Sequence, residues 1–544
     1  MDLLQWVTAL MPVLSVAILL VALRMPASRA MPLALVVTIV LAIVVWGVPG
    51  TQVAASVIEG LLIALSVVLI VLGALAFLGV MRASGSLALI RLDVLRISAD
   101  SRVHLLFVGW LLVCFIEGAA GFGTPATVAA PLLIALGFPA IAAVCLALIA
   151  DVSAVTYGAV GTPIIVGMAE GTGRSWSDPA DRSFLTDVAL TTQQIDFLGS
   201  IAITLIMMFF LTNVFAAERS RRAFVEMIPL TIVAALAFSL PAYFWTSTLG
   251  VEFGGLLGGA TGLVILFVVV RLRLLVPKAP WSVSVGYIDP AELEEMVTTT
   301  QAEAEAAHLS TFRVWAPYLL LTVLLLATRI IDELQAGLNE RWTLGISDIL
   351  GTDISSSFAP LYSPGVIFLI VAAFTFWLHH VPREKLGPTA RSVGSAVLGS
   401  AVVLAAAVPI VRVFLNSGVN SNGLASMPLE LATAAEEAIG DAWPLAAPWV
   451  GALGSFVSGS ATFSHLMFAS LQESVAQSVG ADPTVVLAQQ VGGANAGNMV
   501  CVANVVTVAA VVGLLGREGE VIRRTAIPML VYCVIFAAAG FLLA

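Results

Sequence analysis

Charged residues are scarce in this chain of 544 residues. Only 11% of them are charged, whereas 60% are hydrophobic, and the formal net charge is -10. Soluble domains carry about 25% charged residues, so the composition excludes that class and places the chain among polytopic membrane proteins. The negative balance also argues against a nucleic-acid partner.

Metal-binding, phosphate-binding and disulfide patterns are missing as well. The chain has 4 cysteines and 5 histidines, without zinc-type spacing and without a phosphate-binding loop. The cysteines lie in apolar runs, where buried small residues are expected rather than disulfide partners: Cys114, Cys145, Cys501 and Cys533. We therefore expect no cofactor, no metal and no catalytic residue. Short alternating strands are also missing, which leaves a helical bundle as the spanning architecture.

Apolar runs of spanning length recur along the whole chain and predict about 12 to 16 membrane segments, counting broken ones. The first run, Leu3 to Leu23, has no basic region before it and is interpreted as a retained helix. Basic and acidic loops alternate, and by the positive-inside rule this pattern puts both termini outside.

The runs and loops divide the chain into seven regions. They are N-terminal membrane helices (1–102), a first broken-helix unit (103–168), membrane helices with an external acidic loop (169–276), a cytoplasmic acidic helix linker capped by Asp289 (277–313), membrane helices of the second half (314–443), a second broken-helix unit (444–515) and a C-terminal membrane helix (516–544).

Two of these regions share an order of features. Each has an apolar approach, a small-residue break that contains Phe, a second apolar arm and a polar, glycine-rich second break. The first breaks are Glu117 to Gly123 and Ser458 to Ser464. Because the first unit is entered from a basic loop and the second from an acidic loop, the units are predicted to be inverted repeats of re-entrant hairpins, a pattern typical of secondary transporters. Helix packing through small residues is the alternative, but it does not explain Glu117.

Three charged residues are predicted to lie deep in the membrane, where an ionised side chain costs about 2.5 to 3.5 kcal/mol: Glu117, Asp151 and Arg412. Arg412, Asn416 and Asn420 are spaced by four, so in a helix they share a face that suits a carboxylate. The alternative is that Arg412 neutralises Glu117 or Asp151 as a structural pair.

These features define the candidate site. The expected substrate-binding residues are Gly118, Ala119, Gly121, Phe122, Gly123, Thr124, Arg412, Asn416, Asn420, Gly459, Ser460, Thr462, Ser464 and His465. The residues expected to couple transport to a proton or another ion are Glu117, Asp151, Asn495 and Asn498.

Four segments, EGAAGFGTP, YGAVGTPI, GSFVSGSATFSHLMFASLQ and GGANAGNMV, resemble in sequence and order the L-lactate permease family of bacterial inner-membrane carriers. The resemblance covers nearly the full length. It implies multi-pass insertion in the inner membrane and uptake of lactate or glycolate with protons. The chain departs from the family pattern at Ala461, His465 and Asn498, and it carries charges at Arg412 and Asp151 where uncharged residues are expected.

The resulting hypothesis is a secondary transporter of a small hydroxy-monocarboxylate, coupled to protons, that works in the lipid bilayer and is not an enzyme. The alternative is a sodium-coupled symporter or an exchanger of a different organic acid anion. The sequence leaves a homodimer open.

Overall fold

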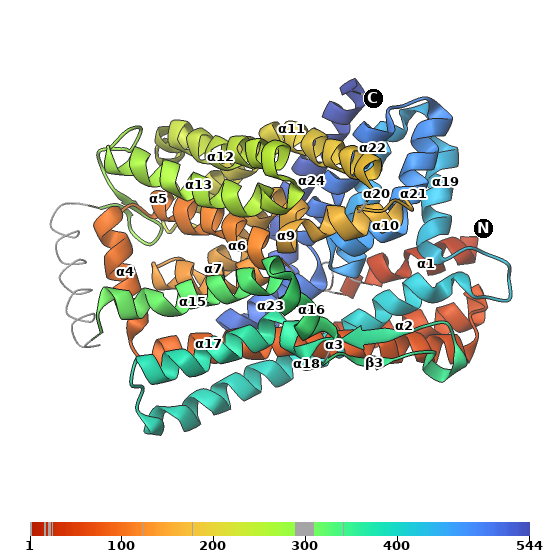
Figure 1. The fold of residues 1–544 in the computed structure, drawn as a ribbon, viewed down its shortest axis with the longest axis horizontal. Helices are drawn as coiled ribbons and strands as arrows, with labels where there is room; N and C mark the ends of the chain where they lie inside the picture. The colour runs from red at the N-terminus through yellow and green to blue at the C-terminus, as the bar shows by residue number, and fades with distance from the viewer. Residues whose placement is uncertain are drawn as a thin grey trace.

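A computed structural model describes residues 3–15, 18–19, 23, 25–121, 123–176, 178–288, 309–340 and 342–543, and helices dominate them (Figure 1). Ten of the described helices are long and apolar enough to cross a membrane, and a pair bent by 64°, Ala140–Ser153 with Val155–Gly171, adds another. Shorter apolar helices cover Leu3–Pro12, Thr124–Ala135 and Pro364–Leu378. With these included, the number of apolar segments lies within the expected range. The protein is an all-α polytopic membrane protein, as predicted.

The unbroken helices lie outside the two broken units in the sequence. They are α1 (Leu3–Ser15), α2 (Ala27–Leu41), α3 (Gly50–Ala83), α4 (Ser86–Ile97), α11 (Pro179–Phe209), α12 (Arg221–Leu249), α13 (Val251–Arg271), α15 (Thr311–Ile330), α16 (Asp332–Glu340), α17 (Pro364–Leu378), α18 (Leu386–Leu415), α19 (Met427–Ile439) and α24 (Glu518–Leu543). α3 has 34 residues, so at 1.5 Å per residue it is about 50 Å long, well beyond the roughly 30 Å hydrocarbon layer.

Shorter helical pieces form the two broken units. The first consists of α5 (Ser101–His104), η3 (Leu105–Leu112), α6 (Val113–Ala120), α7 (Thr124–Ala135), α8 (Ala140–Ala150), η4 (Asp151–Ser153), η5 (Val155–Tyr157), α9 (Gly158–Thr162), η6 (Pro163–Met168) and α10 (Ala169–Gly171). The second consists of α20 (Trp443–Ser458), α21 (Ala461–Val479), α22 (Pro483–Asn498) and α23 (Val502–Val512).

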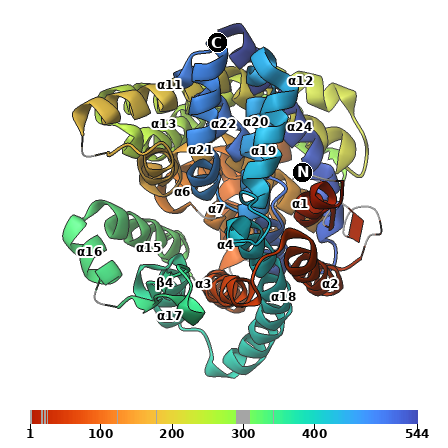
Figure 2. The ribbon, with the colours of Figure 1, turned by 90° about the vertical axis from the view of Figure 1, so that its right-hand side faces the viewer.

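The helices are arranged in two lobes, which Figure 2 shows one above the other. α2, α3, α15, α17 and α18 form one lobe, in which α17 and α18 both pack along α3. The other lobe contains both broken units, with α11, α12, α13 and α24 packed around them. We call these the α3 lobe and the broken-helix lobe.

Two small antiparallel sheets lie outside the long helices. β1 (Trp281–Ser282) pairs with β2 (Gly286–Tyr287), with Trp281 opposite Tyr287. β3 (Leu344–Ile346) pairs with β4 (Ser356–Phe358), with Gly345 opposite Ser357. The predicted acidic linker helix, with its cap at Asp289, lies outside the described residues.

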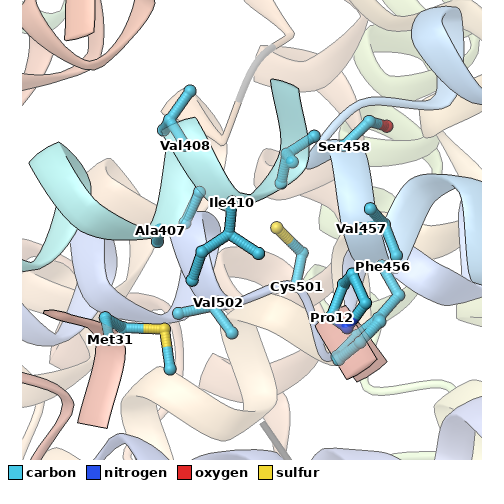
Figure 3. Close-up of a pocket in the computed structure, with 12 residues that line it drawn as sticks. Pro12, Met31, Ala407, Val408, Ile410, Phe456, Val457, Ser458, Cys501 and Val502 are labelled. Carbon is cyan, nitrogen blue, oxygen red and sulfur yellow. The ribbon is translucent and has the colours of Figure 1, made fainter. Parts of the chain in front are cut away.

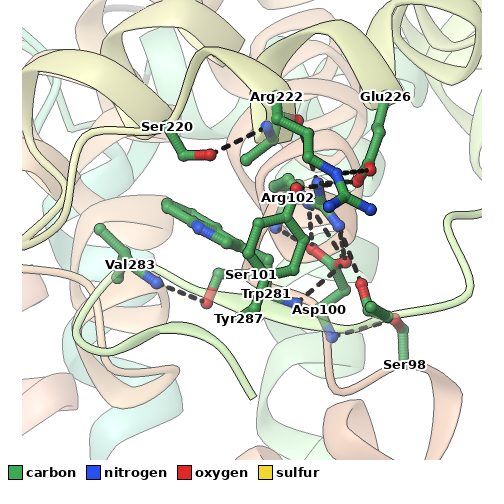
Figure 4. A network of polar contacts seen from close by, with 12 residues as sticks. Ser98, Asp100, Ser101, Arg102, Ser220, Arg222, Glu226, Trp281, Val283 and Tyr287 are labelled. Carbon is green, nitrogen blue, oxygen red and sulfur yellow. Dashed lines mark hydrogen bonds and ion pairs between the residues drawn. The ribbon is translucent and has the colours of Figure 1, made fainter. Parts of the chain in front are cut away.

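A buried polar network anchors the β1–β2 hairpin where the first broken unit begins (Figure 4). The Arg102 guanidinium is fully buried and forms ion pairs with Asp100 at 2.6 Å and Glu226 at 3.5 Å. The backbone N–H of Trp281 donates to the Asp100 carboxylate over 3.2 Å, and the Tyr287 hydroxyl donates to Glu226 over 3.0 Å. Burial and the neighbouring Glu226 carboxylate raise the pKa of Tyr287, which therefore stays protonated as a donor.

Candidate functional site

The first broken unit begins with a hairpin whose tip contains two left-handed glycines. α6 ends at Ala120 and α7 starts at Thr124, and between them Gly121 has φ 61° and Gly123 has φ 72°. Side chains other than glycine rarely adopt these angles, so these two glycines suit the break between α6 and α7 that the sequence predicts. Phe122 lies outside the described residues.

The second break of this unit is strained. After the short turns η4 and η5, the residues Ala159 (φ 44°), Val160 (φ 60°) and Gly161 (φ 79°) follow one another in the left-handed region. Each non-glycine residue there costs roughly 1–2 kcal/mol, and for a β-branched valine the conformation is an outlier. Such strain persists only where the surroundings enforce it, and it gathers at functional sites.

The second unit has a shorter first break than expected. α20 ends at Ser458, Gly459 has φ 74°, and α21 starts at Ala461. The predicted break from Ser458 to Ser464 is therefore wrong at its far end, because the Ser464 N–H already donates to the Ser460 carbonyl as in a helix. The last break, Met499 to Cys501, separates α22 from α23.

Three of the breaks, together with Asn498 and Asn504 on either side of the fourth, surround one small cavity of about 20 Å³. The first unit contributes Glu117, Gly121, Gly123, Val155, Gly158, Ala159, Thr162 and Pro163, and the second contributes Gly459, Ser460, Ala461, Thr462, Asn498 and Asn504. A cavity of this volume holds about one water molecule, so it is closed to a larger ligand in this structure. We call it the break cavity.

The break cavity contains only part of the candidate site. Of the expected residues, its lining includes Glu117, Gly121, Gly123, Gly459, Ser460, Thr462 and Asn498. Those placed outside the lining are Gly118, Ala119, Thr124, Asp151, Arg412, Asn416, Asn420, Ser464, His465 and Asn495. Except for Val155, the lining residues of the first unit that were not selected belong to the YGAVGTP segment, and its glycines were the signal for them.

Glu117 and Asp151 form a carboxyl pair beside the break cavity. Both side chains are almost fully buried, and the two carboxyl groups lie close enough to interact with each other. Among the described residues, Glu117 Oε2 and Asp151 Oδ1 have no hydrogen-bond partner, and no Lys or Arg forms an ion pair with either group. Two contacting carboxylates without a cation cannot both be ionised, so the pair holds a proton.

Asparagine side chains of the second unit lie at or near the break cavity, where they approach the first unit. Asn498 Oδ1 accepts from the Ser455 hydroxyl at 2.8 Å and from Asn504 Nδ2 at 3.5 Å. Asn495 Nδ2 donates to Thr156 Oγ1 of η5 at 2.7 Å, which ties the two units together. The other amide atom, Asn495 Oδ1, is buried without a partner in the described part of the chain.

Arg412 lies in α18 and has a partner that the sequence analysis did not identify. Its guanidinium pairs with Glu59 of α3 at 3.4 Å and stacks on the Phe463 ring at 4.7 Å. The alternative interpretation, in which Arg412 pairs with Glu117 or Asp151, is therefore wrong. Asn416 donates to the same Glu59 carboxylate at 2.8 Å, so both expected substrate ligands are engaged by one acidic side chain.

The remaining expected ligands stabilise local structure. Asn420 organises its own loop, donating to the Leu424 carbonyl at 2.7 Å. Ser464 joins the two arms of the second hairpin, because its hydroxyl donates to the Gly451 carbonyl at 2.8 Å. His465 is fully buried in α21, and neither ring nitrogen has a hydrogen-bond partner within the residues that the structure describes.

The two units are interleaved. The return arm of the first hairpin, α7, packs against α23 of the second unit, whereas the return arm of the second hairpin, α21, packs against η6 and α10 of the first. An ion pair strengthens the second contact, with Arg174 donating to both carboxylate oxygens of Glu473 at 2.6 and 2.7 Å. Each hairpin is thus covered by the far arm of the other unit.

A second, apolar cavity of about 50 Å³ lies behind the breaks of the second unit (Figure 3). Met31, Ile410, Val457, Cys501 and Val502 are among its lining residues, and its wall is contributed by both lobes. An anion placed there would lose its hydration without gaining hydrogen bonds. The break cavity is therefore the better candidate for a polar ligand.

Gly158→Ala tests the fit between the break and the carboxyl pair. A Cβ at this position would overlap Glu117 Oε1, although the φ of -54° suits alanine. Overpacking of this kind costs about 1–3 kcal/mol, so we expect about a tenfold loss of transport rate. Gly394→Ala in α18 is the matched control, because a Cβ there meets no atom of the described chain within 4 Å. Equal transport by the two variants would contradict a role for the close packing of Gly158 against Glu117.

Comparison with known proteins identifies relatives of this chain. The chain is 27% identical to a putative L-lactate permease of Haemophilus influenzae, covering 90% of this chain and 89% of that protein. It is 27% identical to the glycolate permease GlcA of Escherichia coli, covering 95% and 91%. A crystal structure of the Alcanivorax borkumensis YdaH transporter aligns over 91% of this chain and 87% of that one, with 16% identity and a TM-score of 0.32. The family model for L-lactate permease matches residues 5–544. The chain therefore belongs to the L-lactate permease family.

Proposed function

We propose that the protein is a secondary transporter that carries a small hydroxy-monocarboxylate, such as L-lactate or glycolate, across the inner membrane together with protons. The observation that carries this proposal is the break cavity, where a proton-holding carboxyl pair adjoins two hairpin tips. The names of the relatives, L-lactate permease and glycolate permease, support the substrate class.

Helix N-termini are the proposed anion-binding groups. α7 begins after Gly123 and α21 begins after Ser460, and neither start has a side-chain cap from the described residues. The first N–H groups of a helix have no partner within it, and the helix dipole adds partial positive charge there. Gly123 and Ser460 both line the break cavity, so a carboxylate in the cavity would meet the start of one helix from each unit.

The carboxyl pair gives a reason for coupling to protons. No Lys or Arg of the described chain lines the break cavity, so a substrate carboxylate near Glu117 would be repelled when both members of the pair are ionised. Protonation of the pair removes that repulsion before the substrate enters. Substrate and proton would then bind together and leave together.

The two units are proposed to act as inverted repeats. The reciprocal packing of α7 on α23 and of α21 on η6 and α10 supports this relation. In such transporters the substrate lies near the membrane midplane between the repeats, and the two sides open in turn. The break cavity, with walls from both units, is the site that alternating access would expose.

Uptake of labelled L-lactate into proteoliposomes tests the proposal. We expect accumulation when a proton gradient is imposed alone, and none in liposomes without protein or under a sodium gradient alone. Unlabelled glycolate should compete. Accumulation that depends on sodium would instead support a sodium-coupled carrier, for which the buried Asn495 Oδ1 offers an oxygen ligand. No uptake under either gradient by folded protein would overturn the substrate assignment.

A further inference from the structure

A groove lies between the two lobes, at one end of α3 and α23. Its volume is about 560 Å³, against about 20 Å³ for the break cavity, and no described residue lines both. The groove is lined by α3 and α18 of the α3 lobe and by Ala510, Val511 and Gly513 at the end of α23, which belongs to the broken-helix lobe. α23 also packs directly on α18 and α3. A molecule in this groove, which we call the interlobe groove, would therefore contact both lobes.

Apolar side chains form most of the groove. Leu75 and Leu78 of α3 line it together with Val393 and Ala396 of α18, and we call these four residues the apolar strip. The two leucines lie about two turns and one turn before Arg82, the basic residue in the last turn of α3. A polar molecule beside them would lose its hydration without gaining hydrogen bonds, whereas a hydrocarbon chain would bury apolar surface. The apolar strip therefore suits an acyl chain.

Positive charge gathers at one end of the groove. Arg82 and Lys385, the last residue of η10 (Arg383–Lys385), both line it, and neither forms an ion pair with a carboxylate of the described chain. The Lys385 ammonium donates to the Ala83 carbonyl over 2.8 Å, which places it beside Arg82 and leaves two of its three N–H groups for a ligand. Glu384 is the only acidic side chain among the lining residues that the structure describes. The lining therefore carries two cations and one carboxylate.

The basic end of the groove belongs to the cytoplasmic side by the positive-inside rule. Arg383 and Arg391, on either side of Lys385, are exposed, and so is Arg517 in the loop after α23. Anionic lipids give the cytoplasmic leaflet a negative surface potential, and basic pockets between membrane helices on this side bind their head groups. The charge of this end thus complements the phosphate of an anionic lipid in that leaflet.

We propose that the interlobe groove binds an anionic phospholipid, whose phosphate is held by Arg82 and Lys385 and whose acyl chain lies along the apolar strip. A free phosphate would contact only the basic end, and a zwitterionic lipid would bring an ammonium group to an end that is already positively charged. A bound anionic lipid would join α3 and α18 to α23, so it should stabilise the packing of the two lobes. The site is independent of the substrate and of the coupling ion.

Arg82→Gln removes one of the two cations. The Arg82 side chain has no hydrogen bond or ion pair with the rest of the described chain, so its loss should leave the fold intact. We expect the apparent affinity for phosphatidylglycerol to fall about fivefold, the usual effect of one Lys or Arg near an anionic lipid surface. Arg271→Gln is the matched control, because Arg271 ends α13, is exposed and lies outside the groove lining.

The experiment measures thermal denaturation of the purified full chain in a detergent that removes bound lipid, while one of three compounds is added. These are phosphatidylglycerol, phosphatidylcholine with the same acyl chains, and inorganic phosphate. We expect phosphatidylglycerol to raise the Tm of the wild type and of Arg271→Gln in a saturable way. Arg82→Gln should need about fivefold more of this lipid for the same rise, and the other two compounds should have little effect.

Three outcomes would overturn the inference. An equal rise in Tm with phosphatidylcholine would show that the charge of the head group is not recognised. An equal rise with inorganic phosphate would show that the basic end binds a free anion rather than a lipid. An unchanged response of Arg82→Gln to phosphatidylglycerol would place the lipid elsewhere. If Arg82→Gln does not fold, Lys385→Gln takes its place, since a glutamine amide can also donate to the Ala83 carbonyl.

Discussion

Glu117→Gln is expected to abolish proton-driven accumulation of substrate while substrate exchange continues. Across a gradient of about two pH units, one coupled proton supports about a hundredfold accumulation, because each unit is worth a factor of ten. Glutamine resembles the protonated acid in shape but carries no exchangeable charge, so the variant should bind substrate in the break cavity without moving a proton. The accumulation ratio under a pH gradient, set beside counterflow exchange, measures the two properties separately.

The partner of Glu117 should behave in the same way. Asp151→Asn removes the other half of the carboxyl pair, and since the two groups share a proton, either change should break coupling. Glu170→Gln is a matched control, because Glu170 belongs to the same unit but is exposed at α10. Accumulation by Glu117→Gln equal to that of the control would remove the pair from the coupling mechanism.

Arg412→Gln is expected to destabilise the protein by about 3 kcal/mol, because loss of one partner leaves a buried charge uncompensated. Glu59 would keep only the hydrogen bond from the Asn416 amide at 2.8 Å. Glu59→Gln should cost a similar amount. The double variant Glu59→Gln with Arg412→Gln leaves no uncompensated charge, and we expect its stability to return towards that of the wild type.

Thermal denaturation and uptake of the four proteins together define what Arg412 does. Because Arg412 is engaged by Glu59 and lies outside the lining of the break cavity, we expect the double variant to transport lactate. A stable double variant that no longer transports would instead show that the guanidinium is needed by the substrate carboxylate. A single variant as stable as the wild type would show that the ion pair contributes nothing.

The breaks were predictable from sequence because clustered glycines weaken a membrane helix and permit the backbone to reverse inside an apolar run. Gly121, Gly123 and Gly459 adopt the left-handed angles that the pattern implies. The membrane-spanning helices follow from hydropathy in the same way. By contrast, the first break of the second unit ends earlier than expected, since serine and threonine also fit the first turn of a helix.

Buried acids in unbroken helices were missed. Glu59 and Asp196 lie near the starts of apolar runs, where an acidic side chain is usually placed at the membrane surface. α3 and α11 have 34 and 31 residues, longer than the roughly 20 needed to cross, so the depth of a residue cannot be counted from the end of its run. The partners, Arg412 and Tyr532, are more than 300 positions away, and only the fold brings them close.

The interleaving of the two units has a consequence for how the protein is made. A ribosome completes the first unit long before it reaches residue 443, yet α7 and α10 rest on helices of the second unit. Until those helices emerge, Glu117, Asp151 and the irregular backbone at 151–161 lack their final cover. The lipid around the newly inserted first unit cannot form hydrogen bonds with these side chains or with this backbone. Assembly of this half must therefore wait for the other, and its survival in the meantime depends on shielding by earlier helices or by the insertion machinery.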